Sequence, residues 1–346
     1  MLHFCTYFDS HYLPRALALY RSLQAHCPSF ALWGLCMDAL SYDLLSKMDI
    51  PEFHCIRLED FEREDQSLLR TKSNRSTVEY YFTCTPSLPL FLLNRHPDID
   101  RITYLDADLF CFSNPSSFFS EIRNHSISIV PHRFHPRLNR LEIRGLYNVG
   151  FLSFRRDENA SSCLRDWRQK CIEWCYDHEE EGRYADQKYL DSWPTRFEGV
   201  VALENKGVNL GPWNVSNYEI SYDGNRVLVA GQALLFFHFH GLREITPWLY
   251  DPNVTVFRGK LAKAAKEQIY IPYIQALRQT TKEIASSLPK DSLLAGIREI
   301  GKRRSLGSRL WLYLDRLVYV FLLLGRRNFI VVPSNRAFHQ RWGRRR

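Results

Sequence analysis

Apolar and polar positions alternate along the first 250 residues with two different periods. Apolar residues two positions apart predict strands at 2–8, 31–36, 53–58, 127–131 and 147–154 and a strand pair at 227–235. Apolar residues three or four positions apart predict helices at 12–26, 42–48, 76–93, 116–123, about 160–174 and 186–193, the third of them kinked by its prolines. Because strands alternate with helices, we expect an α/β fold on a mostly parallel sheet.

A further strand runs through the apolar stretch RITYLDADLFCF, which begins at Arg101 and leads into Asp106, Ala107 and Asp108. Carboxylates at the edge of an apolar sheet are costly unless they are paired, hydrogen-bonded or bound to a metal ion. In an extended segment, residues two apart face the same side, so Asp106 and Asp108 could approach one hard cation. Acid pairs of this spacing are also common in turns, and the pair alone leaves both interpretations open.

Two histidines follow in the stretch FFHFHGLREITPW. His238 and His240 lie two positions apart, and either could supply the nitrogen ligand that a site with two carboxylates lacks. The alternative is a buried structural histidine. Glycine weakens the strand YNVGFLSF, so Gly150, beside Asn148, marks either a close approach of another group to the backbone or a β-bulge.

The composition is that of a folded protein, with 45% apolar and 14% aromatic residues. Its nine cysteines form no CxxC pair and mostly lie in apolar runs, as expected for a reduced, cytoplasmic protein. Pro14, Arg15 and Arg21 interrupt the apolar core that a signal peptide would need. A cytoplasmic location is therefore expected.

The net charge of +8 is concentrated at the C-terminal end. From Gly301 onward, 12 of the 46 Lys and Arg residues stand against one acid, Asp315, and the first 300 residues keep 34 basic and 37 acidic residues. This distribution indicates an anionic surface as a partner rather than a basic substrate cleft. The apolar stretch 310–324 is 15 residues long and interrupted by Asp315 and Arg316, which is too short to span a membrane. A membrane-surface helix and a helix packed on the catalytic domain are the two interpretations.

Taken in order, these stretches resemble the nucleotide-sugar glycosyltransferases of the GT-A fold, in particular the retaining family 8 enzymes that build bacterial polysaccharide and lipopolysaccharide. YLDADLF resembles the metal-binding Asp-x-Asp strand, YNVGFLSF the Asn-x-Gly strand, and Asp186-Gln187 the Asp-Gln pair beside the donor sugar. HFHGLREITPW, in which His238 stands three residues before Gly241, resembles the closing motif that supplies a third metal ligand. The similarity covers roughly residues 2 to 250.

The resemblance implies a Rossmann-like GT-A domain with a mixed, mostly parallel sheet flanked by helices, followed by a helical, basic C-terminal extension. It implies transfer of a hexose from a nucleotide diphosphate sugar, expected to be a UDP-sugar, to a glycan or lipid-linked acceptor with retention of configuration. Asp106, Asp108 and His238 would hold Mn²⁺ or Mg²⁺, and an imidazole ligand favours manganese.

The resemblance also assigns roles around the donor. Asp186 would bind sugar hydroxyls and Gln187 would lie near the anomeric carbon. The other donor-binding residues that it implies are Tyr7, Phe8, Asp9, Tyr12, Asp106, Ala107, Asn148, Gly150 and Gly241. One position departs from the family pattern, because Thr83 stands where a Tyr-x-Arg sequence would place an arginine. Lys72 or Arg75 would then contact the donor, or the donor is bound differently.

We expect three parts in the chain: a catalytic domain at 1–250, a helical extension at 251–300, and a basic tail at 301–346. The tail would dock on an anionic membrane surface and hold the enzyme at the cytoplasmic face of the membrane. Nucleic acid is not an expected partner, and the sequence makes no prediction of the oligomeric state.

Two other functions fit parts of the sequence. A sugar nucleotidyltransferase would use the same metal, but such enzymes usually have an early Gly-rich phosphate loop, and residues 1–30 contain no glycine. A non-catalytic binding protein could contact nucleic acid with its basic tail. The apolar run 318–324 does not suit an exposed nucleic-acid face.

Overall fold

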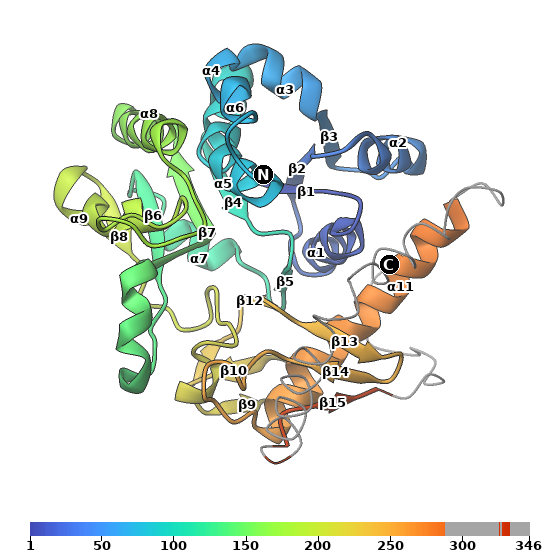
Figure 1. Cartoon of the computed structure of the whole chain (residues 1–346). Helices are drawn as coiled ribbons and strands as arrows, with labels where there is room; N and C mark the ends of the chain where they lie inside the picture. The colour runs from blue at the N-terminus through green and yellow to red at the C-terminus, as the bar shows by residue number, and fades with distance from the viewer. Residues whose placement is uncertain (288–324, 326, 333–346) are drawn as a thin grey trace, which may run out of the picture.

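Seven strands form the central sheet, in the order β3-β2-β1-β4-β7-β6-β8 (Figure 1). The structure, a computed structural model, describes residues 1–287, 325 and 327–332. The strands are β1 Leu2–Phe8, β2 Phe30–Cys36, β3 Phe53–Arg57, β4 Arg101–Leu105, β6 Ile127–Pro131, β7 Tyr147–Arg155 and β8 Val200–Ala202. β7 runs antiparallel to β4 and β6, while the remaining neighbours pair in parallel. The predicted fold class is confirmed, and the arrangement agrees with the GT-A fold.

Helices cover both faces of this sheet because each face is apolar. Helices α1, α2 and α7 pack on one face, and α3 to α6, α8 and α9 pack on the other. Their bounds are α1 Leu13–His26, α2 Ala39–Met48, α3 Leu58–Glu64, α4 Gln66–Thr71, α5 Thr77–Cys84, α6 Ser87–Arg95, α7 Ser116–Glu121, α8 Glu158–Glu173 and α9 Trp193–Arg196. The range predicted as one kinked helix holds α5 and α6, and the break falls at Thr85 and Pro86. Proline has no N–H to continue the helical hydrogen bonds, which explains the break.

The chain leaves the central sheet at the end of β4. The N–H of Asp106 still donates to the Gly150 carbonyl at 3.0 Å, and the N–H of Leu109 then returns to the Asp106 carbonyl at 3.0 Å. This turn redirects the chain into β5 (Leu109–Cys111), which pairs with β12 (Phe236–His238) in a separate two-stranded sheet. The expectation that Asp106 to Asp108 is extended is therefore wrong, because the segment is a tight turn.

The second half of the chain builds a third apolar core below the central sheet in Figure 1, around β5, β12 and two small sheets. The strands of these sheets are β9 Ile220–Tyr222, β10 Val227–Val229, β11 Gln232–Ala233, β13 Arg243–Thr246, β14 Leu249–Asp251 and β15 Ile330–Val331. The remaining helical segments are η1 Pro136–Arg144, η2 Lys188–Ser192, η3 Val215–Asn217, α10 Lys263–Ala265, η4 Lys266–Tyr270 and α11 Ile271–Ser287. α11 packs against α1, where the Thr280 hydroxyl donates to the Pro14 carbonyl.

The described part of the predicted tail belongs to this third core. β15 pairs with β14, and Ile330 and Val332 are buried among residues that come from both sides of position 250. The predicted membrane-surface helix at 310–324 lies outside the described residues. Among the residues that the structure describes, no helix is both long enough and apolar enough to cross a membrane. The three-part division of the chain stays a prediction.

Candidate functional site

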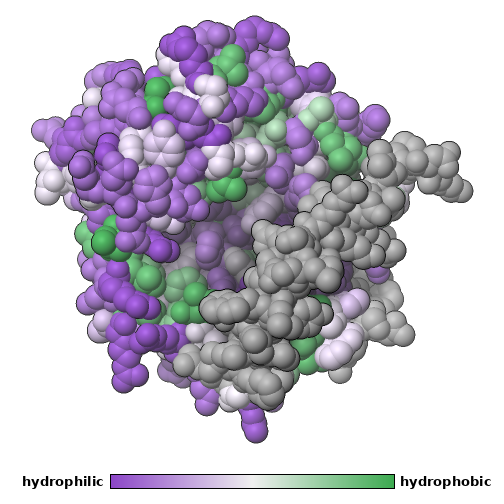
Figure 2. Space-filling model, viewed as in Figure 1, coloured by the Kyte–Doolittle hydropathy of each residue, from purple (hydrophilic) through white to green (hydrophobic). Residues whose placement is uncertain are grey.

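The carboxyl ends of the central parallel strands surround a cavity of about 260 Å³. Because β7 is antiparallel, its start lies beside the end of β4, with Phe151 opposite Leu105. The lining of the cavity includes the predicted residues Tyr7, Asp106, Asn148, Gly150, Asp186 and Gln187. Figure 2 shows a hollow in the middle of this face, where β7, β5 and β12 approach one another in Figure 1. Ligands of open α/β sheets commonly bind at this edge.

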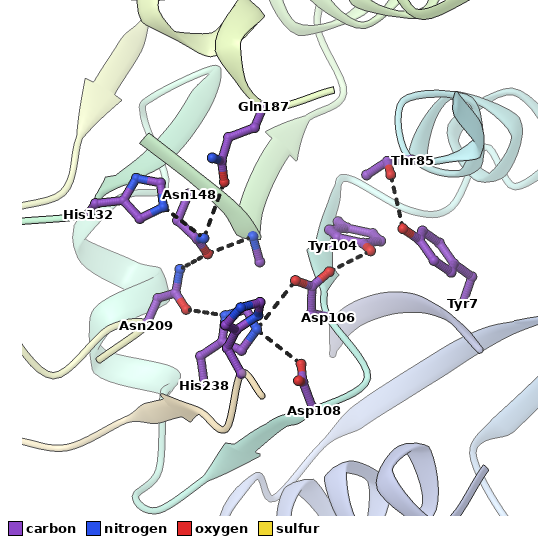
Figure 3. Close-up of polar contacts among 12 residues, drawn as sticks. Tyr7, Thr85, Tyr104, Asp106, Asp108, His132, Asn148, Gln187, Asn209 and His238 are labelled. Atoms are coloured by element: carbon purple, nitrogen blue, oxygen red, sulfur yellow. Dashed lines mark hydrogen bonds and ion pairs between the residues drawn. The ribbon is translucent and has the colours of Figure 1, made fainter. Parts of the chain in front are cut away.

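Asp106, Asp108 and His238 converge at the edge of the cavity, which Asp106 and His238 line (Figure 3). The Nε2 atom of His238 lies 3.0 Å from an oxygen of Asp108 and 3.5 Å from an oxygen of Asp106. One ligand atom from each of the three residues lies within 4.8 Å of the others. The turn after β4 presents the carboxylates, and the end of β12 presents the imidazole. The backbone bond from the N–H of Phe239 to the Asp108 carbonyl, 2.9 Å long, joins the two segments.

The charges of this cluster depend on one another. Burial alone would lower the pKa of His238, but the carboxylates, Asp108 above all, raise it above its usual value. Burial alone would raise the pKa of Asp108, and the imidazolium of His238 instead lowers it to about 2. Burial raises the pKa of Asp106 despite the opposite effect of His238. A buried carboxylate, Asp108, and a half-buried one, Asp106, therefore need a positive charge between them, which a proton on His238 or a cation can supply.

A chain of hydrogen bonds fixes which nitrogen of His238 faces the carboxylates (Figure 3). The backbone N–H of Gly150 can only donate, so the side-chain oxygen of Asn148, 2.9 Å away, must accept. The same oxygen accepts from the Asn209 amide nitrogen at 2.7 Å. The Asn209 oxygen therefore faces Nδ1 of His238 at 3.2 Å, which makes Nδ1 the protonated nitrogen. Nε2 is then free to bind a cation, which is the usual arrangement of a metal-binding histidine.

Gly150 leaves room for this imidazole. A Cβ atom at position 150 would lie 2.6 Å from both Cε1 and Nδ1 of His238 and 2.7 Å from the Asn148 oxygen. The sequence predicted either a close approach to this backbone or a bulge. The structure has both, because the register of β6 and β7 also shifts between Ile129 and Val130.

The ligand atoms of Asp106, Asp108 and His238 fit a divalent cation. Two carboxylates and one imidazole supply hard oxygen ligands and one nitrogen, a combination that suits manganese and also magnesium. The sequence left open whether His238 or His240 supplies the nitrogen ligand, and the structure places His238 beside both carboxylates. The exposed ring of His240 stands edge-on to the ring of His238, with 5.8 Å between their centroids. Lewis-acid chemistry at this point of the cavity is therefore within the reach of these residues.

Asp186 and Gln187 also line the cavity. The Gln187 oxygen accepts from the Asn148 amide nitrogen at 3.3 Å, and its own nitrogen donates to the Arg144 carbonyl at 3.0 Å. Burial, and secondarily the charge of Asp106, raises the pKa of Asp186 to about 7. Its carboxyl group can therefore donate as well as accept a hydrogen bond near neutral pH.

Tyr7 lines the cavity from the end of β1, and Tyr104 is buried behind it on β4. The Tyr104 hydroxyl donates to Asp106 at 2.7 Å, and the Tyr7 hydroxyl lies 3.3 Å from the Thr85 hydroxyl. Tyr104 is buried and Tyr7 is half-buried, and this burial raises the pKa of each phenol well above its usual value. They therefore act as neutral hydrogen-bonding groups.

Other residues predicted from the sequence lie outside this lining. Phe8 is buried against Phe53, Ala107 is buried in the turn, and Gly241 has a φ of 69° in the turn after β12. Asp9 accepts from the N–H groups of His11 and Tyr12. Tyr12 is 44% exposed and is covered by the guanidinium of Arg15.

Lys72 and Arg75 have other partners. Lys72 lies 2.7 Å from the buried carboxylate of Glu62, and Arg75 stacks on Tyr176 and donates to the Ile172 carbonyl. Neither residue lines the cavity. Thr83, which stands at the expected arginine position, is buried and donates to the Glu79 carbonyl.

Several residues of the site were not predicted. Asn209 is fully buried between Val208 and Leu210, and a polar amide between two apolar neighbours in the loop VNLGPWN was the available signal. His132, Arg144 and Trp213 also line the cavity, and all three lie outside the strands and helices predicted from the sequence. Trp213 stands edge-on to the ring of His238, with 5.2 Å between centroids, and closes its side of the site.

The fold and the site define an α/β protein of the GT-A type with two carboxylates and one imidazole gathered at the edge of its sheet. No protein-family model matches the sequence. The chain is 32% identical over 290 residues to the uncharacterized protein YfnD of Bacillus subtilis (strain 168), a match that covers 83% of this chain and 92% of YfnD. It is 32% identical over 251 residues to the uncharacterized protein YfnF of the same strain, covering 70% of this chain and 82% of YfnF. The chain belongs to the family of these two proteins.

Two solved structures illustrate its likeness in overall fold. The galactosyltransferase LgtC, in complex with donor and acceptor sugar analogues, is 14% identical with a TM-score of 0.48, and the match covers 84% of this chain and 98% of LgtC. Mouse xyloside xylosyltransferase 1 is 14% identical with a TM-score of 0.46, and the match covers 69% of this chain and 98% of that chain.

Proposed function

We propose that the chain is a metal-dependent glycosyltransferase that moves a hexose from a nucleotide diphosphate sugar, a UDP-sugar, to a glycan or lipid-linked acceptor with retention of configuration. One observation carries the proposal. Four stretches of the sequence meet at one cavity, which is lined by Asp106, Asn148, Gly150, Asp186, Gln187 and His238, and Asp108 joins Asp106 and His238 in the cluster behind it. These are the stretches that resemble the functional motifs of family 8 enzymes.

The departure of a nucleoside diphosphate leaves negative charge that must be stabilised. A divalent cation held by Asp106, Asp108 and His238 would supply Lewis-acid stabilisation of this leaving group. The protein prepares the site by directing Nε2 of His238 and two carboxylates toward the same point. The Tyr104 hydroxyl also orients Asp106 through its 2.7 Å hydrogen bond.

The sugar would lie against Asp186, Gln187 and Asn148. Asp186 can accept from one sugar hydroxyl and, when protonated, donate to another, because burial raises its pKa to about 7. The Gln187 amide is held at both ends, by Asn148 and by the Arg144 carbonyl, so its orientation is set before the donor arrives. An amide oxygen is a weak nucleophile, which favours attack by the acceptor from the side of the leaving group over a covalent glycosyl intermediate on Gln187.

The acceptor and the location follow from charge. A glycan of a bacterial polysaccharide or lipopolysaccharide, presented on a lipid at the cytoplasmic face of the membrane, suits a chain whose last 46 residues hold 12 of its 46 basic residues. Vesicle sedimentation with and without anionic phospholipid tests this part of the proposal. Truncation for this experiment belongs after Val332, because residues 327–332 pack in the third core.

The decisive experiment is a panel of UDP-, GDP- and ADP-sugars, each with and without Mn²⁺, read as release of nucleotide. We expect metal-dependent release from a UDP-sugar, and a loss of at least about a hundredfold in Asp108→Asn, because a ligand of the cation is removed. Asp60→Asn is the matched control, since Asp60 is an exposed carboxylate that pairs only at the surface. Nuclear magnetic resonance of the product's anomeric proton reads the stereochemistry.

Two outcomes would contradict the proposal. Release that is independent of metal and unchanged in Asp108→Asn would exclude the cluster from the reaction. Formation of pyrophosphate from UTP and a sugar 1-phosphate, without transfer from any nucleotide sugar, would identify a nucleotidyltransferase instead.

A further inference from the structure

A second cavity lies next to the cavity of about 260 Å³ that holds the candidate site, and Trp213 and Phe257 line both of them. Its volume is about 370 Å³, and its other lining residues include Arg137, Arg258 and Lys260. A third cavity of about 450 Å³ shares Arg258 and Lys260 with it and adds Arg327. We call the surface made by these four basic residues, Arg137, Arg258, Lys260 and Arg327, the basic groove.

No described residue neutralises the positive charge of the basic groove. All four side chains are exposed, and none of them forms an ion pair with a residue that the structure describes. No described residue that lines either cavity is acidic. Arginines nearby are used differently, since Arg144 pairs with Glu179 at 2.8 Å. Arg133 is occupied by the carbonyls of Asn205 and Val208, so it supports the loop that carries Asn209.

The backbone under the groove is held in place from two sides. The Ser216 hydroxyl accepts from the N–H of Lys260 and donates to its carbonyl, each at 3.1 Å. The Asn328 side chain donates to the Gly259 carbonyl at 2.9 Å and accepts from the N–H of Leu261 at 2.8 Å. Arg258 and Lys260 are therefore mounted on an ordered turn, and Arg137 faces them from η1. Cations on a fixed backbone lose less conformational freedom when they bind an anion.

We propose that the basic groove binds the phosphate group of the acceptor. The inference rests on the proposed transferase function, because it takes the neighbouring cavity as the donor site. Guanidinium groups bind phosphate oxygens through paired hydrogen bonds, and lysine adds a compact charge. The shared wall of Trp213 and Phe257 would then place the acceptor's sugar beside the donor's sugar while its phosphate lies in the groove. The phosphate belongs either to a soluble phosphorylated glycan or to a lipid headgroup.

The first test measures binding without metal or nucleotide. Isothermal titration calorimetry in EDTA compares glucose 6-phosphate with glucose, two probes that differ only in the phosphate. We expect binding of glucose 6-phosphate that weakens as sodium chloride is raised, and about a tenfold loss of affinity in the double variant Arg258→Gln/Lys260→Gln. The matched control is Lys47→Gln/Arg70→Gln, which removes the same charge from exposed positions on α2 and α4. Arg137→Gln, on a separate element, repeats the test if the double variant does not fold.

A second arm distinguishes the source of the phosphate. Vesicles of phosphatidylglycerol are sedimented with the wild type and with the same variants. Binding of glucose 6-phosphate assigns the groove to a soluble ester, and binding of vesicles alone, lost in the groove variants, assigns it to a lipid headgroup. Both outcomes support a phosphate site.

Three results would overturn the proposal. The first is that the groove variants bind both phosphate probes with the affinity of the wild type. The second is that the control variant Lys47→Gln/Arg70→Gln loses as much affinity as the groove variant. The third is that single-stranded RNA binds through the groove residues while neither phosphate probe binds. Failure of the proposed function is a separate result, because the wild type would then release no nucleotide from any nucleotide sugar whatever the groove binds.

Discussion

Replacing Gly150 by alanine is the sharpest test of the metal cluster, because it adds one methyl group at a known place. The backbone at Gly150 does not have a positive φ, so alanine fits its conformation without strain. The consequence is purely steric. The new Cβ would lie 2.6 Å from two ring atoms of His238, whereas ordinary contacts begin at about 3.4 Å.

The size of the effect follows from this overlap. The His238 ring must retreat by several tenths of an ångström, but it is only 2% exposed and has Trp213 edge-on beside it. Metal ligands tolerate displacements of about 0.2 Å. The added Cβ would also crowd the Asn148 oxygen, which would lie only 2.7 Å away. This oxygen orients the imidazole through Asn209. We therefore expect Mn²⁺ affinity to fall at least about tenfold.

The assay is the electron paramagnetic resonance signal of free Mn²⁺, titrated with protein, together with a thermal melt. Gly224→Ala is the control, because its Cβ meets nothing within 4 Å while its φ of 92° makes alanine strained. This control should lose stability and keep its Mn²⁺ affinity. In a His238→Ala background, Gly150→Ala should have no further effect on Mn²⁺ affinity, since the clashing ring is absent.

The reasoning fails if Gly150→Ala binds Mn²⁺ as the wild type does. It also fails if the loss has the same size with and without His238, since the methyl group would then act through something other than the imidazole.

Three further predictions follow from buried polar groups. Asn209→Leu removes the acceptor for Nδ1 of His238 and should lower Mn²⁺ affinity about 10- to 100-fold, and an unchanged titration would exclude Asn209 from orienting the ring. Burial raises the pKa of Asp186 to about 7, so the unfolded chain loses this proton first and folding stability falls as pH rises from about 4 to 7. In EDTA, Asp186→Asn should therefore lose less melting temperature than the wild type between pH 5 and pH 8, and parallel curves would contradict the assignment. Asn328→Ala should lower the free energy of unfolding by about 1–3 kcal/mol, because it leaves the N–H of Leu261 and the Gly259 carbonyl unpaired, and denaturation with urea measures this.

The residues of the candidate metal site were predictable, but the geometry that unites them was not. The apolar run before Asp106 predicts a strand that ends there, and β4 does end at Leu105. The expected extended segment is a turn instead, because Leu109 to Cys111 pairs with β12 rather than with the central sheet. Alternation of apolar residues is the same in both cases, so the pattern cannot reveal which partner a strand will find.

The supporting groups show a second limit. Asn209 orients His238 through the direction of its carboxamide, and this direction cannot be predicted from the residue type. Lys72 and Arg75 were reasonable candidates by charge and position, yet a buried carboxylate and an aromatic ring already occupy them. Charge is readable from a sequence, whereas the neighbour that neutralises it depends on tertiary packing.

The carboxamide of Asn148 belongs to two hydrogen-bond chains at once. Its oxygen side leads through Asn209 to His238, and its nitrogen side contacts Gln187 at 3.3 Å and His132 at 3.1 Å. A shift of this one group would change both the imidazole that would face the proposed cation and the amide that would face the proposed donor sugar. Thermodynamic linkage then makes the effect reciprocal, so the factor by which the cation tightens binding of the donor equals the factor by which the donor tightens binding of the cation. Cooperative loading of the site would thus originate in the orientation of a single amide.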